Sequence, residues 1–153
     1  MVTAPRRVIG LGNPDRGDDA VGLHVARRLA ARGLEGVEVR EATGDALALL
    51  EDLASAAHLV LVDAAAPLAA PGRIHRLDPL SRPLPREIVP ASTHAFGLAE
   101  VIELARALGQ LPARLSVYAI EAAGFGAGAP LSAPVAAAVE RVVERIAAEL
   151  VGG

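Results

Sequence analysis

The chain has 153 residues and a formal net charge of −3, and 52% of its residues are apolar while only 2% are aromatic. This length suits one domain, residues 1–153, with a core of alanine, valine and leucine. Few aromatic side chains and no cluster of Lys and Arg argue against a nucleic-acid partner, because such partners require stacking and phosphate contacts. The absence of cysteine excludes disulfides, zinc ribbons and a thiol nucleophile.

The hydropathy pattern predicts a protein of the cytoplasm with no membrane partner. No stretch approaches 18 uncharged apolar residues, which is the length that a membrane-spanning helix needs. The first residues also lack the long hydrophobic region of a signal peptide.

The first half of the chain alternates short apolar runs with segments of helical period. The expected elements are a strand at 7–11 with a turn at 12–14, a helix at 18–32, a strand at 37–41, a helix at 45–53 and a strand at 58–63. Asp45 can cap the second helix. The strand at 58–63 is apolar up to Asp63, which is typical of a central parallel strand.

The second half contains one short connection and one proline-rich passage. The expected elements are a strand at 72–77, a surface loop at 79–90, a helix from about Thr93 to Gly109, a strand at 115–121, a mobile glycine loop at 124–128 and a helix capped by Ser132. The connection from Asp63 is too short for a parallel crossover, so the strand at 72–77 should be antiparallel at an edge. The pattern predicts an α/β fold, a three-layer α/β/α sandwich whose mostly parallel, five-stranded twisted sheet has one antiparallel edge strand.

Ligands of open α/β sheets bind beyond the carboxyl ends of the strands. The polar residues expected there are Asn13, Asp15, Asp18, Asp19, Asp63, Ser92, Thr93, His94 and Glu121. Two carboxylates and an imidazole suit Zn²⁺, Ni²⁺ or a similar ion, which makes Asp19, Asp63 and His94 the candidate metal ligands.

Each candidate also has a structural interpretation. Asp18 or Asp19 can cap the first helix, where a carboxylate accepts free backbone N–H groups. Asp63 can form a turn, although a single charge after four apolar residues favours function. His94 is a poor helix cap because its positive form opposes the helix dipole. We expect His24, His58 and His75 to be structural or exposed to solvent.

Gly10 and Gly12 also suggest a nucleotide-binding turn. The third glycine of that pattern would fall at position 15, which is Asp15, and acidic residues surround the turn. A pyrophosphate needs N–H donors without competing negative charge, so this interpretation is disfavoured.

Three spaced motifs, with a fourth near the end, resemble the hydrogenase maturation endopeptidases. They are residues 12–22 (GNPDRGDDAVG), 61–64 (LVDA), 93–98 (THAFGL) and 128–132 (GAPLS). The resemblance implies a metal-dependent peptidase that removes a C-terminal peptide from the nickel-loaded large-subunit precursor of a [NiFe]-hydrogenase. It implies that Asp19, Asp63 and His94 bind nickel presented by the precursor, for which other divalent metals can substitute. The family often has Glu where this chain has Asp19, and Asp18 competes for the same role.

Catalysis through a side-chain nucleophile is not indicated. The chain has no cysteine, no G-x-S-x-G turn and no H-E-x-x-H helix. Hydrolysis would then use water assisted by a metal at Asp19, Asp63 and His94. The loops 79–90 and 124–128 are candidate sides of the peptide site. Two alternatives stay open: an esterase like the peptidyl-tRNA hydrolases, which share the Gly-Leu-Gly-Asn-Pro opening, and a non-catalytic nickel-binding chaperone.

Overall fold

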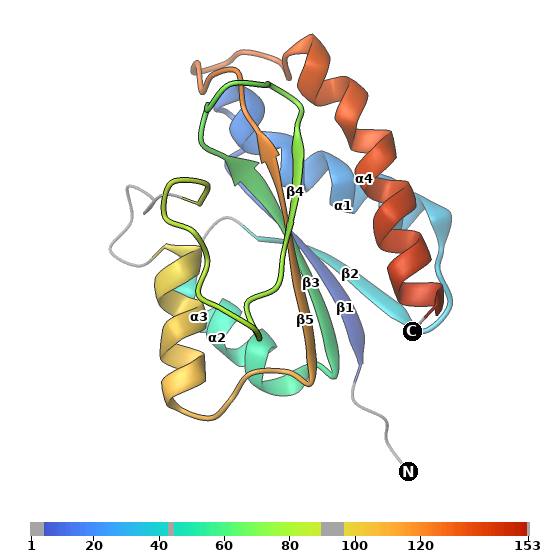
Figure 1. Cartoon of the computed structure of the whole chain (residues 1–153). Helices are drawn as coiled ribbons and strands as arrows, with labels where there is room; N and C mark the ends of the chain where they lie inside the picture. Colours follow the sequence, from blue (N-terminus) through green and yellow to red (C-terminus); the bar gives the residue numbers. More distant parts are fainter. Residues whose placement is uncertain (1–4, 43–44, 90–96, 153) are drawn as a thin grey trace.

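The computed structural model describes residues 5–42, 45–89 and 97–152. Its sheet has the strand order β2-β1-β3-β5-β4 (Figure 1). The strands are β1 (Arg6–Leu11), β2 (Val37–Ala42), β3 (His58–Ala65), β4 (Ile74–Leu77) and β5 (Arg114–Glu121). All neighbouring pairs are parallel except β4 and β5. The prediction of a mostly parallel sheet with one antiparallel edge strand is therefore confirmed.

Helices cover both faces of this sheet. They are α1 (Val21–Arg32), α2 (Ala46–Ser55), α3 (Leu98–Ala107) and α4 (Ala133–Gly152), with a short 3₁₀ helix, η1 (Gly17–Ala20), before α1. Helices α1 and α4 pack on one face, and α2 and α3 on the other. The predicted three-layer arrangement is confirmed. Within the described ranges, no helix has the length and apolar character needed to cross a membrane.

The central strand β3 shows how the sequence divides the core. Leu59 and Leu61 belong to the cluster under α2 and α3, whereas Val60 and Val62 belong to the cluster under α1 and α4. All four side chains are fully buried. A strand covered on both faces must be apolar at every position, which explains the continuous run in the sequence.

Two predicted boundaries are wrong. β3 does not end on Asp63 but continues to Ala65, because Asp63 and the next two residues keep their pairing with β5. α3 begins at Leu98 and not near Thr93, since Gly97 has extended backbone with ψ of 177°. Thr93 itself lies outside the described residues. The cap of α2 is confirmed, because Asp45 accepts hydrogen bonds from the backbone N–H groups of two helix residues.

The proline-rich passage after β4 does more than lie over the surface. Leu84 and Val89 are 5% and 3% exposed and belong to the core cluster under α2 and α3. The prediction of a purely superficial loop is therefore wrong, because two apolar residues between the prolines supply burial that the loop would otherwise lack.

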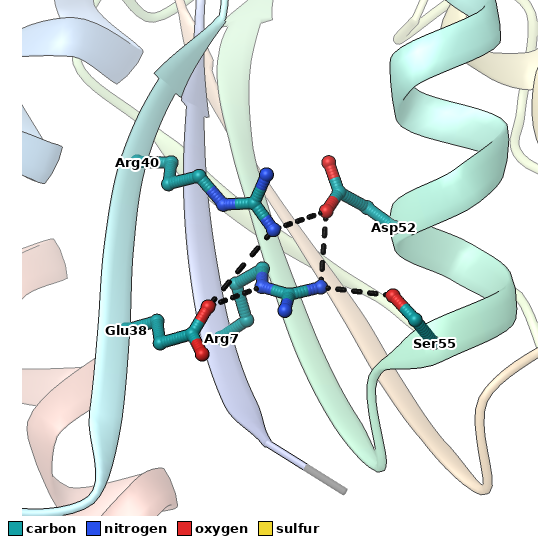
Figure 2. A network of polar contacts seen from close by, with 5 residues as sticks. All are labelled: Arg7, Glu38, Arg40, Asp52 and Ser55. Carbon is teal, nitrogen blue, oxygen red and sulfur yellow. Dashed lines mark hydrogen bonds and ion pairs between the residues drawn. The ribbon is translucent and has the colours of Figure 1, made fainter.

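A polar network joins β1, β2 and α2 in the half of the sheet that includes the β2 edge (Figure 2). The Arg7 guanidinium is almost buried and donates to Glu38 at 2.9 Å, to Asp52 at 3.0 Å and to the Ser55 hydroxyl at 3.1 Å. Asp52 also accepts from Arg40 at 2.6 Å. Because buried charges need partners, Asp52 holds the two arginines in place.

Replacing Asp52 should destabilise the fold. In Asp52→Ala, the buried Arg7 loses a charged partner, so the free energy of unfolding should fall by about 2–3 kcal/mol in urea denaturation. Glu51→Ala is the matched control, since Glu51 is the exposed neighbour on α2. An equally small loss in both variants would contradict a stabilising role for this network.

Candidate functional site

Backbone contact between α1 and the sheet brings the first acidic motif to the carboxyl edge. A Cβ atom added at Gly22 would lie 2.3 Å from the Leu11 carbonyl oxygen and 2.4 Å from that of Val62. A Cβ atom at Gly12, whose φ is 151°, would lie 2.0 Å from the carbonyl oxygen of Asp19. Only glycine permits both approaches. Helix η1, with Asp18 and Asp19, therefore lies directly against the ends of β1 and β3.

Asp18 is a buried carboxylate that the fold supplies with hydrogen-bond donors. It is 2% exposed. Its Oδ1 accepts from the Ser132 backbone at 2.7 Å, and its Oδ2 accepts from the Ser132 hydroxyl and the Ala123 backbone, both at 2.8 Å. Burial raises the pKa of Asp18, but the hydrogen bonds from Ser132, Ala123 and Gly124 outweigh it, so the pKa is lowered. Asp18 is thus ionised and satisfied by the chain itself.

The contacts of Asp18 replace its expected role as a helix cap. No side-chain cap is present at the start of η1 or of α1. Ser132 directly precedes α4, as expected, but its hydroxyl donates to Asp18. The glycine loop 124–128 is also tied to this segment, since the Gly128 backbone donates to the Asp15 carbonyl at 2.7 Å. Both oxygens of Asp18 are occupied, which favours Asp19 as the residue that faces a ligand.

Asp63 is a half-buried carboxylate, and its surroundings within the described ranges differ from those of Asp18. Among the hydrogen bonds described for it, its Oδ1 accepts from the backbone of Ala64 at 2.8 Å. Burial raises the pKa of Asp63 to about 7; the bond from Ala64 lowers it, and the negative charge of Asp19 raises it. Two carboxylates that repel each other in a place of low polarity would be stabilised by a cation between them.

The structure brings together two of the three predicted ligands. Asp19 and Asp63 are close enough to interact electrostatically. His94, with Ser92 and Thr93, lies outside the described residues. Within the described part of the chain, no group of three His, Asp or Glu side chains is arranged to hold a metal ion. The two carboxylates therefore remain the described portion of the predicted site.

Glu121, another predicted strand-end residue, belongs to the fold. It is 1% exposed, and its Oε1 accepts from the backbones of Ala69 and Ala70, both at 3.1 Å. Its Oε2 lies 2.7 Å from Nε2 of His75. Burial raises the pKa of Glu121, but the bonds from Ala70, His75 and Ala69 lower it to about 2. Glu121 holds the connection between β3 and β4, and His75 is structural as expected.

His58 and the turn residue Asn13 are also structural, and His24 is exposed to solvent. His58 is buried and lies 3.0 Å from Glu149, whereas His24 is exposed on α1. Asn13 accepts from the Asp15 backbone at 3.0 Å and shapes the turn after β1. A cavity of about 790 Å³ next to His58 opens at the amino ends of the strands. It lies at the edge opposite Asp63, so it is not the predicted site.

Loss of Asp18 should weaken the join between η1 and α4. Asp18→Ala leaves the buried donors of Ser132 and Ala123 without their acceptor, so the free energy of unfolding should fall by about 2–4 kcal/mol. Chemical denaturation measures this change. Asp15→Ala is the control, because the Asp15 side chain is exposed. The assignment fails if both variants unfold at the same denaturant concentration.

Replacing Asp63 should stabilise the metal-free protein at alkaline pH. The ordinary pKa is 3.8 and the folded pKa is about 7, so stability falls with rising pH between these values, where only the unfolded chain is ionised. Asp63→Asn removes this penalty and should gain on the order of 1 kcal/mol above pH 7. Below the ordinary pKa no such gain is expected. The free energy of unfolding is measured by denaturation in the presence of a chelator, at a pH below 3.8 and at a pH above 7. A lower stability of Asp63→Asn than of the parent protein at alkaline pH would contradict the prediction.

Comparisons with known proteins agree with this fold. The family described as hydrogenase maturation protease matches residues 23–149. The hydrogenase 2 maturation protease of Escherichia coli K12 is 30% identical over 122 residues, which are 74% of this chain and 70% of that protein.

Solved structures give the same result. The hydrogenase maturating endopeptidase HybD from E. coli has a TM-score of 0.76 at 25% identity, over 95% of this chain and 91% of that one. The [NiFe] hydrogenase maturation protease HycI from Thermococcus kodakarensis has a TM-score of 0.74 at 25% identity, over 94% and 90%. The resemblance carried by the motifs is confirmed, and the esterase and chaperone alternatives are disfavoured. The chain belongs to the hydrogenase maturation protease family and is therefore a peptidase.

Proposed function

We propose that this protein removes a C-terminal peptide from the large-subunit precursor of a [NiFe]-hydrogenase. In this proposal Asp19, Asp63 and His94 contact nickel that the precursor carries. The observation that supports it is the proximity of Asp19 to Asp63 at the carboxyl edge of the sheet, where the charge of Asp19 disfavours ionisation of Asp63. A precursor that brings a divalent cation would relieve that repulsion.

The donor set fits such an ion. Carboxylate oxygens and an imidazole bind borderline divalent metals, and Ni²⁺ is one of them. Nickel is then a feature of the substrate, and other divalent ions could take its place. Recognition through the ion would restrict cleavage to precursors that have already received their metal.

In this proposal the residues of the chain mainly hold the site in position, and the metal ion assists the chemical step. A metal ion with open coordination positions polarises a scissile carbonyl and assists attack by water. Asp63 is fixed by the pairing of β3 with β5, and Asp19 by the contact of its backbone with Gly12. Asp18 holds η1 against the segment before α4. Such a prearranged site lowers the barrier because little ordering is left for the moment of reaction.

The decisive experiment compares two forms of one precursor. The purified protein should release the C-terminal peptide from the nickel-loaded large subunit and leave the nickel-free form intact. Mass spectrometry of the released peptide measures this. Equal cleavage of both forms would show that the site does not recognise nickel in the precursor.

Variants of the same protein locate the site. Asp19→Asn, Asp63→Asn and His94→Ala should each lower cleavage of the nickel-loaded precursor by about 100-fold, since the first two remove a negative charge from the proposed metal site and the third removes a ligand. His24→Ala should retain the parent rate, because His24 lies exposed on α1. If His24 matters as much as His94, the site has been placed wrongly.

A further inference from the structure

The connection between β3 and β4 has an unusual surface. Residues 66–71 read Ala-Pro-Leu-Ala-Ala-Pro, with no polar side chain. All but the first of them are exposed, and Leu68 is 51% exposed. Exposed connections are normally rich in polar residues that bind water or their own backbone. The apolar segment 66–71 has no such polar side chain, although most of it is exposed to solvent.

The backbone of the apolar segment is held in one conformation. Glu121 lies beneath it and accepts from Ala69 and Ala70, both at 3.1 Å. At its start the Ala66 backbone donates to Ile88 at 3.0 Å, and just after its end the Gly72 backbone donates to the Glu121 carbonyl at 2.8 Å. The buried Glu121 carboxylate is itself fixed by His75. The buried charge of Glu121 thus holds the backbone of the segment, so that its apolar side chains face solvent in a fixed arrangement.

The apolar segment is continuous with the proposed site. It follows β3 directly, three residues after Asp63, at the carboxyl edge of the sheet (Figure 1). The Ala122 backbone donates to the Ala65 carbonyl at 3.2 Å and ties this exit to the end of β5. A polypeptide with its scissile bond at Asp63 must extend along this edge in one direction or the other.

We propose that the apolar segment 66–71 binds apolar side chains of the precursor next to the scissile bond, and that Glu121 is the positioning residue that holds it. The inference rests on the proposed function. The occupant is an extended, apolar stretch of polypeptide, because the segment offers no charge to attract a charged one. A surface ordered before binding loses little entropy when it is covered, so its small area can still contribute to affinity.

Leu68→Ser tests the contact, with Leu108→Ser as its control. Leu68 and Leu108 are 51% and 54% exposed, but Leu108 follows α3 at the opposite, amino edge of the sheet. With nickel-loaded precursor, Leu68→Ser should raise KM roughly tenfold and leave kcat within about twofold, since it removes binding that ground and transition states share. Leu108→Ser should leave both unchanged. The same KM for both variants would overturn the proposal.

Glu121→Gln tests the positioning role. Hydrogen exchange at the Ala69 and Ala70 amides should become faster, because the acceptor loses its charge. KM should rise as in Leu68→Ser while kcat is kept. Faster exchange with an unchanged KM would show that the order of the segment is irrelevant to binding. Leu68→Ser decides the proposal if Glu121→Gln does not fold.

The outcomes separate this inference from the function on which it rests. If the parent protein cleaves no nickel-loaded precursor, the proposed function fails and the inference fails with it. If the parent cleaves and Leu68→Ser is normal, the inference alone fails. Sedimentation tests a second copy of the chain as the occupant: dissociation of a dimer by Leu68→Ser, with unchanged KM, would overturn the proposal.

Discussion

Direct contact between the backbone of α1 and the ends of β1 and β3 places Asp18 and Asp19 at the edge of the sheet. Gly22 allows this contact, since a side chain there would meet two carbonyl oxygens at less than a carbon's normal contact distance. The start of the helix therefore packs directly on the edge of the sheet. Two consecutive aspartates, Asp18 and Asp19, lie at that edge, and their different surroundings give them different roles.

The number of available donors separates the structural carboxylates from the proposed ligands. Asp18 and Glu121 are as buried as core leucines, yet backbone N–H groups and a hydroxyl or imidazole surround them and keep each pKa low. Asp63 is also desolvated, but its neighbour at close range is another carboxylate. Among the described residues, two buried acids are thus supplied with hydrogen-bond donors, whereas Asp63 lies beside a like charge that a cation would offset.

Local patterns in the sequence predicted most of the fold but not the contacts of the site. The run before Asp63 identified the central strand, and the short connection after it identified the antiparallel edge. The role of Asp18 could not be found in this way, because its partner Ser132 is 114 residues away. The true end of β3 depends on pairing with β5, and the burial of Leu84 depends on packing against α3; neither is encoded in adjacent residues.

The carbonyl of Asp19 packs against Gly12, so the main chain and the side chain of Asp19 are constrained differently. Its main chain packs closely against Gly12, whereas its side chain is near enough to Asp63 to interact with it electrostatically. Exchange between Asp and Glu at this position would then change the reach toward a metal by one methylene without altering the path of the chain. The distance from this carboxylate to a ligand could thus change without any change in the fold.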